Sequence, residues 1–190
     1  MVTIATYRPT WAQEFQAQAK WLRYHLGPLA MRIDHIGSTS VPGLSAKNII
    51  DIQITAARLE DALEHKMNAA GFDRNVNILQ DHVPAGREDT REVWGKWFFR
   101  SNAAGRKVNV HVRLPGSANQ RYALLFRDYL RALPAVAQAY GQVKQAIILH
   151  HPEPDMEVYY DIKDPVCDII MGGAEAWAQL TGWKLGPSDG

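Results

Sequence analysis

The sequence has little cysteine, little net charge and no long apolar run, and each absence excludes a class of protein. Its single cysteine, Cys167, excludes an internal disulfide, so the chain is not a disulfide-stabilised small domain. Lys and Arg number 21 against 20 Asp and Glu, and this balance gives no electrostatic basis for binding extended nucleic acid. No run approaches the roughly 18 apolar residues of a membrane span, so we expect no contact with a membrane.

The composition that remains is that of an ordinary globular chain. Hydrophobic residues make up 46% of its 190 residues, which is enough to bury a core. We therefore expect one domain over residues 1–190, with a frayed tail at 184–190. The first residues, MVTIATYRPTW, contain no signal-peptide core, so we expect a cytoplasmic protein.

Apolar periodicity predicts a mixture of helices and strands. Helical spacing predicts a helix from Trp11 to Leu26, a second around 59–67, and a helical rear half that is interrupted at Asp164-Pro165. Alternation predicts strands over 49–55 and 107–114, the latter paired with 93–100 in a hairpin. A weak strand near 76–79 and a mobile loop complete the pattern. These elements predict an α+β fold, a mixed sheet with helices packed mainly on one face.

The stretch from Ile33 to Ile54, IDHIGSTSVPGLSAKNIIDIQI, carries the strongest functional signal. Its last residues alternate, so the isoleucines point to one side of a strand and Asp51 and Gln53 to the other. Gly37-Ser38 ends the preceding apolar segment and predicts a turn at which backbone N–H groups can approach an anion. A phosphate at this turn, with a carboxylate on the next strand, is the arrangement that a nucleotide–metal site needs.

This stretch resembles the signature of the nucleotidyltransferase superfamily: an apolar residue, Gly, Gly or Ser, a spacer, and two carboxylates around an apolar residue. More narrowly, it resembles the GrpB family, which also occurs as a domain fused to some dephospho-CoA kinases. The resemblance extends to three later segments, Val110–Val112, Phe126–Arg131 and Tyr159 with Lys163. It implies a nucleotidyltransferase-like sheet and a nucleotide or other phosphorylated ligand.

Several residues are candidates for binding that ligand. We expect the turn to hold phosphate, with the loop extending its set of donors and basic side chains adding charge. The candidates are Gly37, Ser38, Thr39, Ser40, Lys47, Arg113 and Lys163. Thr39 and Ser40 could instead stabilise the loop, and Lys47 and Arg113 could be solvated cations. The role of Lys163 rests on the resemblance, because related transferases reach the triphosphate with a lysine from a C-terminal helix.

Asp51 is the candidate metal ligand and catalytic residue, and His111 is the candidate proton acceptor. The superfamily places a second carboxylate where this chain has Gln53, and the third is also missing, because the matching polar face holds Asn109, His111 and Arg113. Two-metal chemistry needs several carboxylates, whereas Asp51 and substrate phosphates could hold a single Mg²⁺ that keeps most of its waters. His111 could equally be a structural histidine.

Three functions fit these residues. The first is a Mg²⁺-dependent nucleotidyltransferase that moves a nucleotide monophosphate to a small acceptor. The second is a non-catalytic module that binds a nucleotide or coenzyme A and assists a protein partner such as a kinase. The third is a metal-free enzyme that uses Asp51 and His111 in the same pocket. Nucleotide binding measured with and without Mg²⁺, together with an assay for turnover, separates them. The sequence leaves the oligomeric state open.

Overall fold

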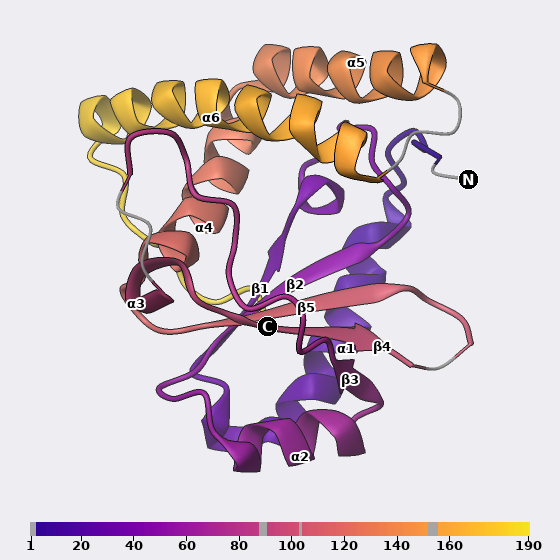
Figure 1. Cartoon of the computed structure of the whole chain (residues 1–190), viewed down its shortest axis with the longest axis vertical. Coiled ribbons are helices and arrows are strands. Elements are labelled where there is room, and N and C mark those ends of the chain that lie inside the picture. The colour runs from indigo at the N-terminus through magenta and orange to yellow at the C-terminus, as the bar shows by residue number, and fades with distance from the viewer. Residues whose placement is uncertain (1–2, 88–90, 103, 152–155) are drawn as a thin grey trace.

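A five-stranded mixed sheet organises the computed structural model, which describes residues 3–87, 91–102, 104–151 and 156–190 (Figure 1). The elements in chain order are α1 (Thr10–Leu26), the short helix η1 (Gly27–Leu29), β1 (Arg32–Ile36), the short helix η2 (Ser38–Ser40), β2 (Ile50–Thr55), α2 (Asp61–Ala69), β3 (Phe72–Arg74), α3 (Arg91–Trp94), β4 (Trp97–Ser101), β5 (Val108–Arg113), α4 (Ala118–Ala132), α5 (Pro134–His150) and α6 (Met156–Thr181).

The strand order is β1-β2-β5-β4-β3, and it places β2 and β5 side by side. These two strands run parallel, whereas β1 with β2, β5 with β4, and β4 with β3 are antiparallel. The predicted hairpin is therefore confirmed as β4–β5. The parallel register sets Asp51 beside Asn109 and Gln53 beside His111. Since side chains alternate along a strand, all four lie on one face of the sheet.

The opposite, apolar face of the sheet forms the main core with α1 and α2. The isoleucines of β2, here Ile50 and Ile52, are fully buried against the stripe of α1 that contains Trp11 and Phe15. Leu63 of α2 closes the same cluster. Burying one such side chain stabilises the fold by about 2 kcal/mol. The predicted α+β fold is confirmed, and so is the apolar stripe of the first helix.

The three C-terminal helices pack on one another and reach the polar face of the sheet through α4. In Figure 1, α5 and α6 lie side by side and α4 descends from them toward the strands. Two buried amide contacts join α4 to β2: Gln53 Nε2 donates to the Gln120 carbonyl, and Gln120 Nε2 donates to Thr55 Oγ1, both at 3.3 Å. The polar face is thus covered beyond Gln53, whereas Asp51 remains 27% exposed. None of the described helices is both long and apolar enough to cross a bilayer.

Two local predictions were wrong. The interruption at Pro165 does not occur, because α6 continues through it. Pro165 has no N–H to donate to the carbonyl four residues earlier, which is that of Asp161. Asp161 is exposed, so water can hydrogen-bond to this carbonyl instead. The strand predicted near 76–79 lies earlier, as β3. A turn follows that strand, in which the Asn77 N–H donates to Asn75 Oδ1 at 3.0 Å.

The tail at 184–190, predicted to fray, is bound along β1. Ser188 Oγ accepts the Ile33 N–H at 2.9 Å and donates to the Ile33 carbonyl at 2.8 Å. The Asp189 carboxylate accepts the His35 N–H at 2.9 Å. β1 is an edge strand with backbone groups that need partners, and the tail supplies them. Short polar segments give no periodic signal, so the sequence pattern could not predict this contact.

Candidate functional site

The Gly37–Ser38 turn lies directly against Asp51. Gly37 follows β1 with φ of 68°, a conformation that favours glycine. A Cβ at this position would lie 2.6 Å from Asp51 Oδ2, so any side chain would collide with the carboxylate. Glycine therefore serves two purposes here: it allows the turn and it brings the turn's backbone to the end of β2. Ser38 begins η2 and is half-buried.

The next two hydroxyls of the turn stabilise it from within. Ser40 Oγ donates to the Gly37 carbonyl at 2.6 Å, and Thr39 Oγ1 lies 3.1 Å from His35 Nε2. Burial lowers the pKa of His35 to about 3, so this imidazole is neutral at pH 7. Thr39 and Ser40 are themselves buried. Their side chains hold the loop in shape, which leaves Ser38 as the accessible hydroxyl of the three.

Asp51 and His111 share a face of the sheet, as their strand positions predicted. Asn109 Nδ2 donates to Asp51 Oδ1 at 2.9 Å, and His111 Nε2 lies 3.9 Å from the same oxygen. The Asn109 amide thus occupies one carboxylate oxygen of Asp51. The other oxygen, Oδ2, is the one that faces Gly37.

The ring of His111 is held neutral, with its Nε2 on the side of Asp51. Its Nδ1 lies 3.2 Å from Lys96 Nζ and 3.4 Å from Arg113 Nη2, and both of these groups can only donate. Nδ1 must therefore accept, which leaves the proton on Nε2. Burial, and after it the charge of Lys96, lowers the pKa of His111 to about 4. This arrangement favours a donor role over the proton acceptor predicted from the sequence.

Arg113, predicted as a ligand-binding cation, is buried and paired with Asp81. Its Nε and Nη2 donate to the two Asp81 oxygens at 2.8 and 3.0 Å, and its Nη1 donates to Gln53 Oε1. Lys96 Nζ also donates to Asp81. Burial favours the protonated form of Asp81, but Arg113 and Lys96 outweigh it and hold the pKa of this carboxyl well below its usual range. Asp81 comes from a loop without periodicity, and the sequence reading missed it.

Lys144 of α5 reaches the turn from the other side and was also missed. Its Nζ donates to Ser38 Oγ at 2.8 Å and to the Ser45 carbonyl at 2.5 Å. Lys144 is only 2% exposed, and burial lowers its pKa to about 7. In the sequence it stands four residues after Tyr140 at the margin of an apolar stripe. A lysine at a buried helical position is the signal that could have identified it, since such a residue needs partners.

Lys47 and Lys163 lie close enough to Lys144 for their charges to lower its pKa, whereas the charge of Asp51 acts to raise it. Lys47 Nζ lies 3.7 Å from the centre of the Tyr159 ring. Burial, followed by repulsion from Lys163, lowers the pKa of Lys47 to about 8. Lys163 Nζ donates to Asp164 at 2.6 Å. Burial acts to lower the pKa of Lys163, but Cys167 and Asp164 outweigh it, and this pKa is raised.

The acidic residues do not form a metal site by themselves. Within the described ranges, no group of three or more His, Cys, Asp or Glu side chains could hold a metal ion. Asp51 remains able to contribute a single carboxylate oxygen. A single Mg²⁺ here would need phosphate oxygens and water for its other positions.

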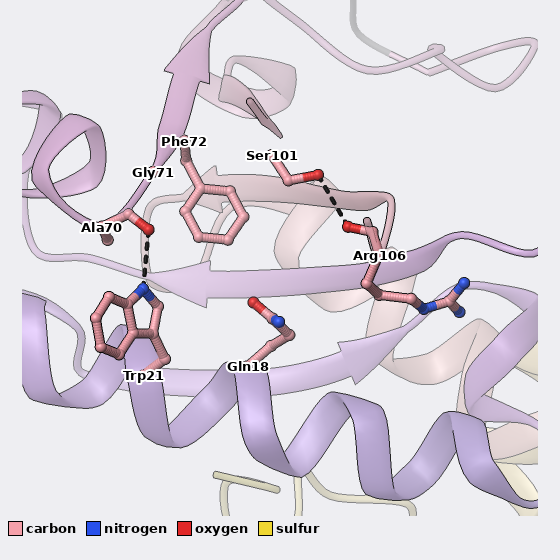
Figure 2. A pocket seen from close by; sticks show the side chains of 7 residues that line it. All are labelled: Gln18, Trp21, Ala70, Gly71, Phe72, Ser101 and Arg106. Atoms are coloured by element: carbon pink, nitrogen blue, oxygen red, sulfur yellow. Dashed lines mark hydrogen bonds between the residues drawn. The ribbon is translucent and has the colours of Figure 1, made fainter. Parts of the chain in front are cut away.

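Two pockets lie away from these residues. One, of about 340 Å³, lies between α1, the turn into β3, and the β4–β5 hairpin (Figure 2). Trp21 borders it and donates its Nε1 proton to the Ala70 carbonyl at 2.8 Å. The other, of about 550 Å³, lies between α4, α6 and residues that include Pro84, Arg87 and Trp94, with Tyr122 in its wall. Neither pocket is lined by a residue that the sequence predicted to bind phosphate.

A protein-family model described as GrpB protein matches residues 1–172. Among curated proteins, the chain is 35% identical to a dephospho-CoA kinase of Mycolicibacterium paratuberculosis, over 93% of this chain and 46% of that protein. It is 30% identical to the UPF0157 protein BH1888 of Halalkalibacterium halodurans, over 92% of this chain and 83% of that protein. The chain therefore spans slightly less than half of the kinase relative, and most of the second.

Among solved structures, the conserved protein GrpB from Enterococcus faecalis has the same fold. The two superpose with a TM-score of 0.75 at 28% identity, covering 92% of this chain and 99% of the other.

Proposed function

This chain belongs to the GrpB family, and we propose that its Gly37–Ser38 turn, with the lysines around it, binds the phosphate groups of a nucleotide or a similar phosphorylated ligand. The resemblance of this turn and Asp51 to the nucleotidyltransferase signature supports the ligand class. The similarity to a dephospho-CoA kinase also supports a nucleotide or coenzyme A ligand.

The observation that carries the proposal is a group of three lysines whose charges act on one another near the turn. Lys47, Lys144 and Lys163 come from a loop, from α5 and from α6, yet Lys163 lowers the pKa of the other two and Lys47 lowers that of Lys144. Burial is the main cause of the lowered pKa of Lys47 and Lys144, and repulsion from neighbouring lysines lowers both values further. A bound polyphosphate offsets that repulsion and favours the charged form of Lys47.

We propose further that Asp51 contributes to one Mg²⁺ bound with the phosphates, and that the protein transfers a nucleotide monophosphate to a small acceptor. A second candidate is a binding module without catalysis. Gln53 favours it, because this side chain supplies no charge to a metal and accepts a hydrogen bond from Arg113 instead. Turnover of a nucleotide in the presence of Mg²⁺ distinguishes the two.

Calorimetric titration with pyrophosphate and ATP tests the binding site. Binding an anion raises the pKa of Lys47, so the protein takes up protons on binding, and the affinity falls as the pH rises from about 7 to 9. We expect Lys144→Met to weaken binding at pH 7 by at least about tenfold, since it removes an N–H donor beside the turn. Lys20→Met, at an exposed lysine of α1, is the matched control and should bind like the wild type. Equal affinities in both variants, or an affinity that rises with pH, would contradict the proposal.

A further inference from the structure

The contact between Ser38 and Lys144 has the geometry of an activated nucleophile. Lys144 Nζ lies 2.8 Å from Ser38 Oγ, within the range needed for direct proton transfer. The Ser45 carbonyl holds the same nitrogen and thereby orients it. A nucleophile, a base and a third group that positions the base are the three parts that nucleophilic catalysis requires.

The surroundings of Lys144 allow it to act as a base near neutral pH. Above its pKa of about 7 the amine is neutral, and its lone pair can accept the Ser38 hydroxyl proton while its own N–H donates to Ser45. The groups that face this amine come from several elements: Tyr140 on α5, whose ring centre is 4.5 Å from Nζ, Cys167 and Lys163 on α6, Lys47 in the loop, and Asp51 on β2. Lys163 and Lys47 favour the neutral amine, whereas Asp51 and Cys167 favour the ammonium.

Ser38 is the hydroxyl of the turn that can meet a substrate. The Ser40 hydroxyl is bonded to the Gly37 carbonyl and that of Thr39 contacts His35, and both residues are buried. Ser38 is partly exposed and follows a glycine that leaves the approach open. The lysine contact therefore falls on the accessible hydroxyl.

We propose that Ser38 is a nucleophile, with Lys144 as its general base, and that it accepts a phosphorus-linked group from a phosphoric anhydride. The ligand class rests on the proposed function. In the step, the Ser38 Oγ–P bond forms as the bond between phosphorus and the leaving phosphate or pyrophosphate breaks. The hydroxyl proton moves to the Lys144 amine, and the resulting ammonium releases it to water.

A base can be distinguished from a simple phosphate clamp by substituting arginine. Lys144→Arg keeps a permanent positive charge and its donors, but guanidinium cannot accept a proton at this pH. A clamp survives this change in part, whereas a base does not. Lys144→Met removes both functions.

The experiment is covalent labelling of the full chain with a fluorophosphonate, followed by intact mass and peptide mapping from pH 5.5 to 9. Oγ displaces fluoride from phosphorus, so the probe reports the nucleophile without requiring a nucleotide. We expect one label, on Ser38, with a rate that rises through an apparent pKa near 7. The rate should fall about 100-fold or more in both Lys144→Met and Lys144→Arg. Ser38→Ala should not be labelled, and Lys20→Arg should react like the wild type.

Thermal unfolding of the same samples shows that each variant is folded, and pyrophosphate binding by the wild type separates this inference from the proposed function. Wild-type labelling rates in Lys144→Arg, or label on other residues but not on Ser38, would overturn the inference. Pyrophosphate binding without any labelling would overturn it and leave the proposed function intact. Labelling of Ser38 without pyrophosphate binding would support the nucleophile and contradict the proposed function.

Discussion

At the scale of single residues, the difference between Asp51 and Gln53 limits how a metal can bind. The two stand on one face of β2, but Gln53 is fully buried and bonded to α4, whereas Asp51 is partly exposed beside the turn. One carboxylate cannot hold two dications. Asp51 is therefore the position at which metal dependence is best tested.

Asp51→Asn should remove the enhancement of nucleotide affinity by Mg²⁺ while leaving the apo protein stable. The amide keeps the shape of the side chain and can still pair with Asn109, so we expect a change within roughly 1 kcal/mol in the free energy of unfolding. It cannot replace the negative charge that a hard cation needs. Calorimetry with ATP, with and without Mg²⁺, and a thermal melt of the apo protein measure both effects. An unchanged Mg²⁺ dependence would make Asp51 a structural residue and favour the binding module.

The residues of this site differ in how far they could be predicted from the sequence. Gly37 and Asp51 could be predicted because a turn signal and strand alternation place them within one short stretch. Helical periodicity could mark Lys144 as a buried lysine but could not identify Ser38 as its partner, and Asp81 comes from a loop without a pattern. Local periodicity carries no information about such long-range contacts.

At the scale of elements, Asp81 ties its loop to the polar face of the sheet. The loop has only an isolated β-bridge, Gln80 with Gly95, next to this residue. The Asp81 carboxylate nevertheless accepts hydrogen bonds from Arg113 of β5, from Lys96 and from Asn119 of α4. The Asp81 N–H also donates to the Trp94 carbonyl at 3.0 Å. One side chain thus joins the sheet, the loop and the C-terminal helices, and it balances two buried cations.

Asp81→Asn should destabilise the fold by about 3–5 kcal/mol at pH 7, because it leaves Arg113 and Lys96 buried without their anion. The pKa of Asp81 is lower in the folded protein than its usual value of about 4. Its contribution is therefore present above pH 4 and is lost as the pH falls below that value. Urea unfolding at pH 7, 4 and 3 should show the difference between wild type and variant shrinking in acid.

The matched control for this prediction is Asp73→Asn. Asp73 is an exposed carboxylate on β3 that accepts a hydrogen bond from Asn102, and its substitution should change stability by less than about 0.5 kcal/mol. A similar small effect for Asp81→Asn would contradict the central role of its ion pairs.

At the scale of the whole molecule, the bound tail joins α4 to the edge of the sheet. Arg127 of α4 donates to Asp189 at 2.6 Å and to the His35 carbonyl at 3.1 Å. Arg127 is 5% exposed, so its buried charge is balanced by this partner and by Asp128. The tail therefore connects the C-terminal helices to β1, although its composition predicts a frayed terminus.

Asp189→Ala should lower the free energy of unfolding by about 1–3 kcal/mol, because the Arg127 guanidinium and the His35 N–H both lose an acceptor. Glu175→Ala is the matched control. It removes the partner of Arg121, which is 45% exposed, so we expect a loss below about 1 kcal/mol. Urea midpoints of the two variants measure the difference. Equal losses would mean that the tail contact adds no more than a surface ion pair.

The parallel pairing of β2 with β5 also has a consequence for how the chain folds. Asp51 and Asn109 are neighbours in the sheet but 58 residues apart in sequence, and no short turn can join them. The entropy of closing so long a loop must be overcome before this pair forms, whereas the β4–β5 hairpin can form early from local contacts. The carboxylate and the amide therefore meet only late in folding. In hydrogen exchange, the amides that pair β2 with β5 should therefore open before those of the β4–β5 hairpin.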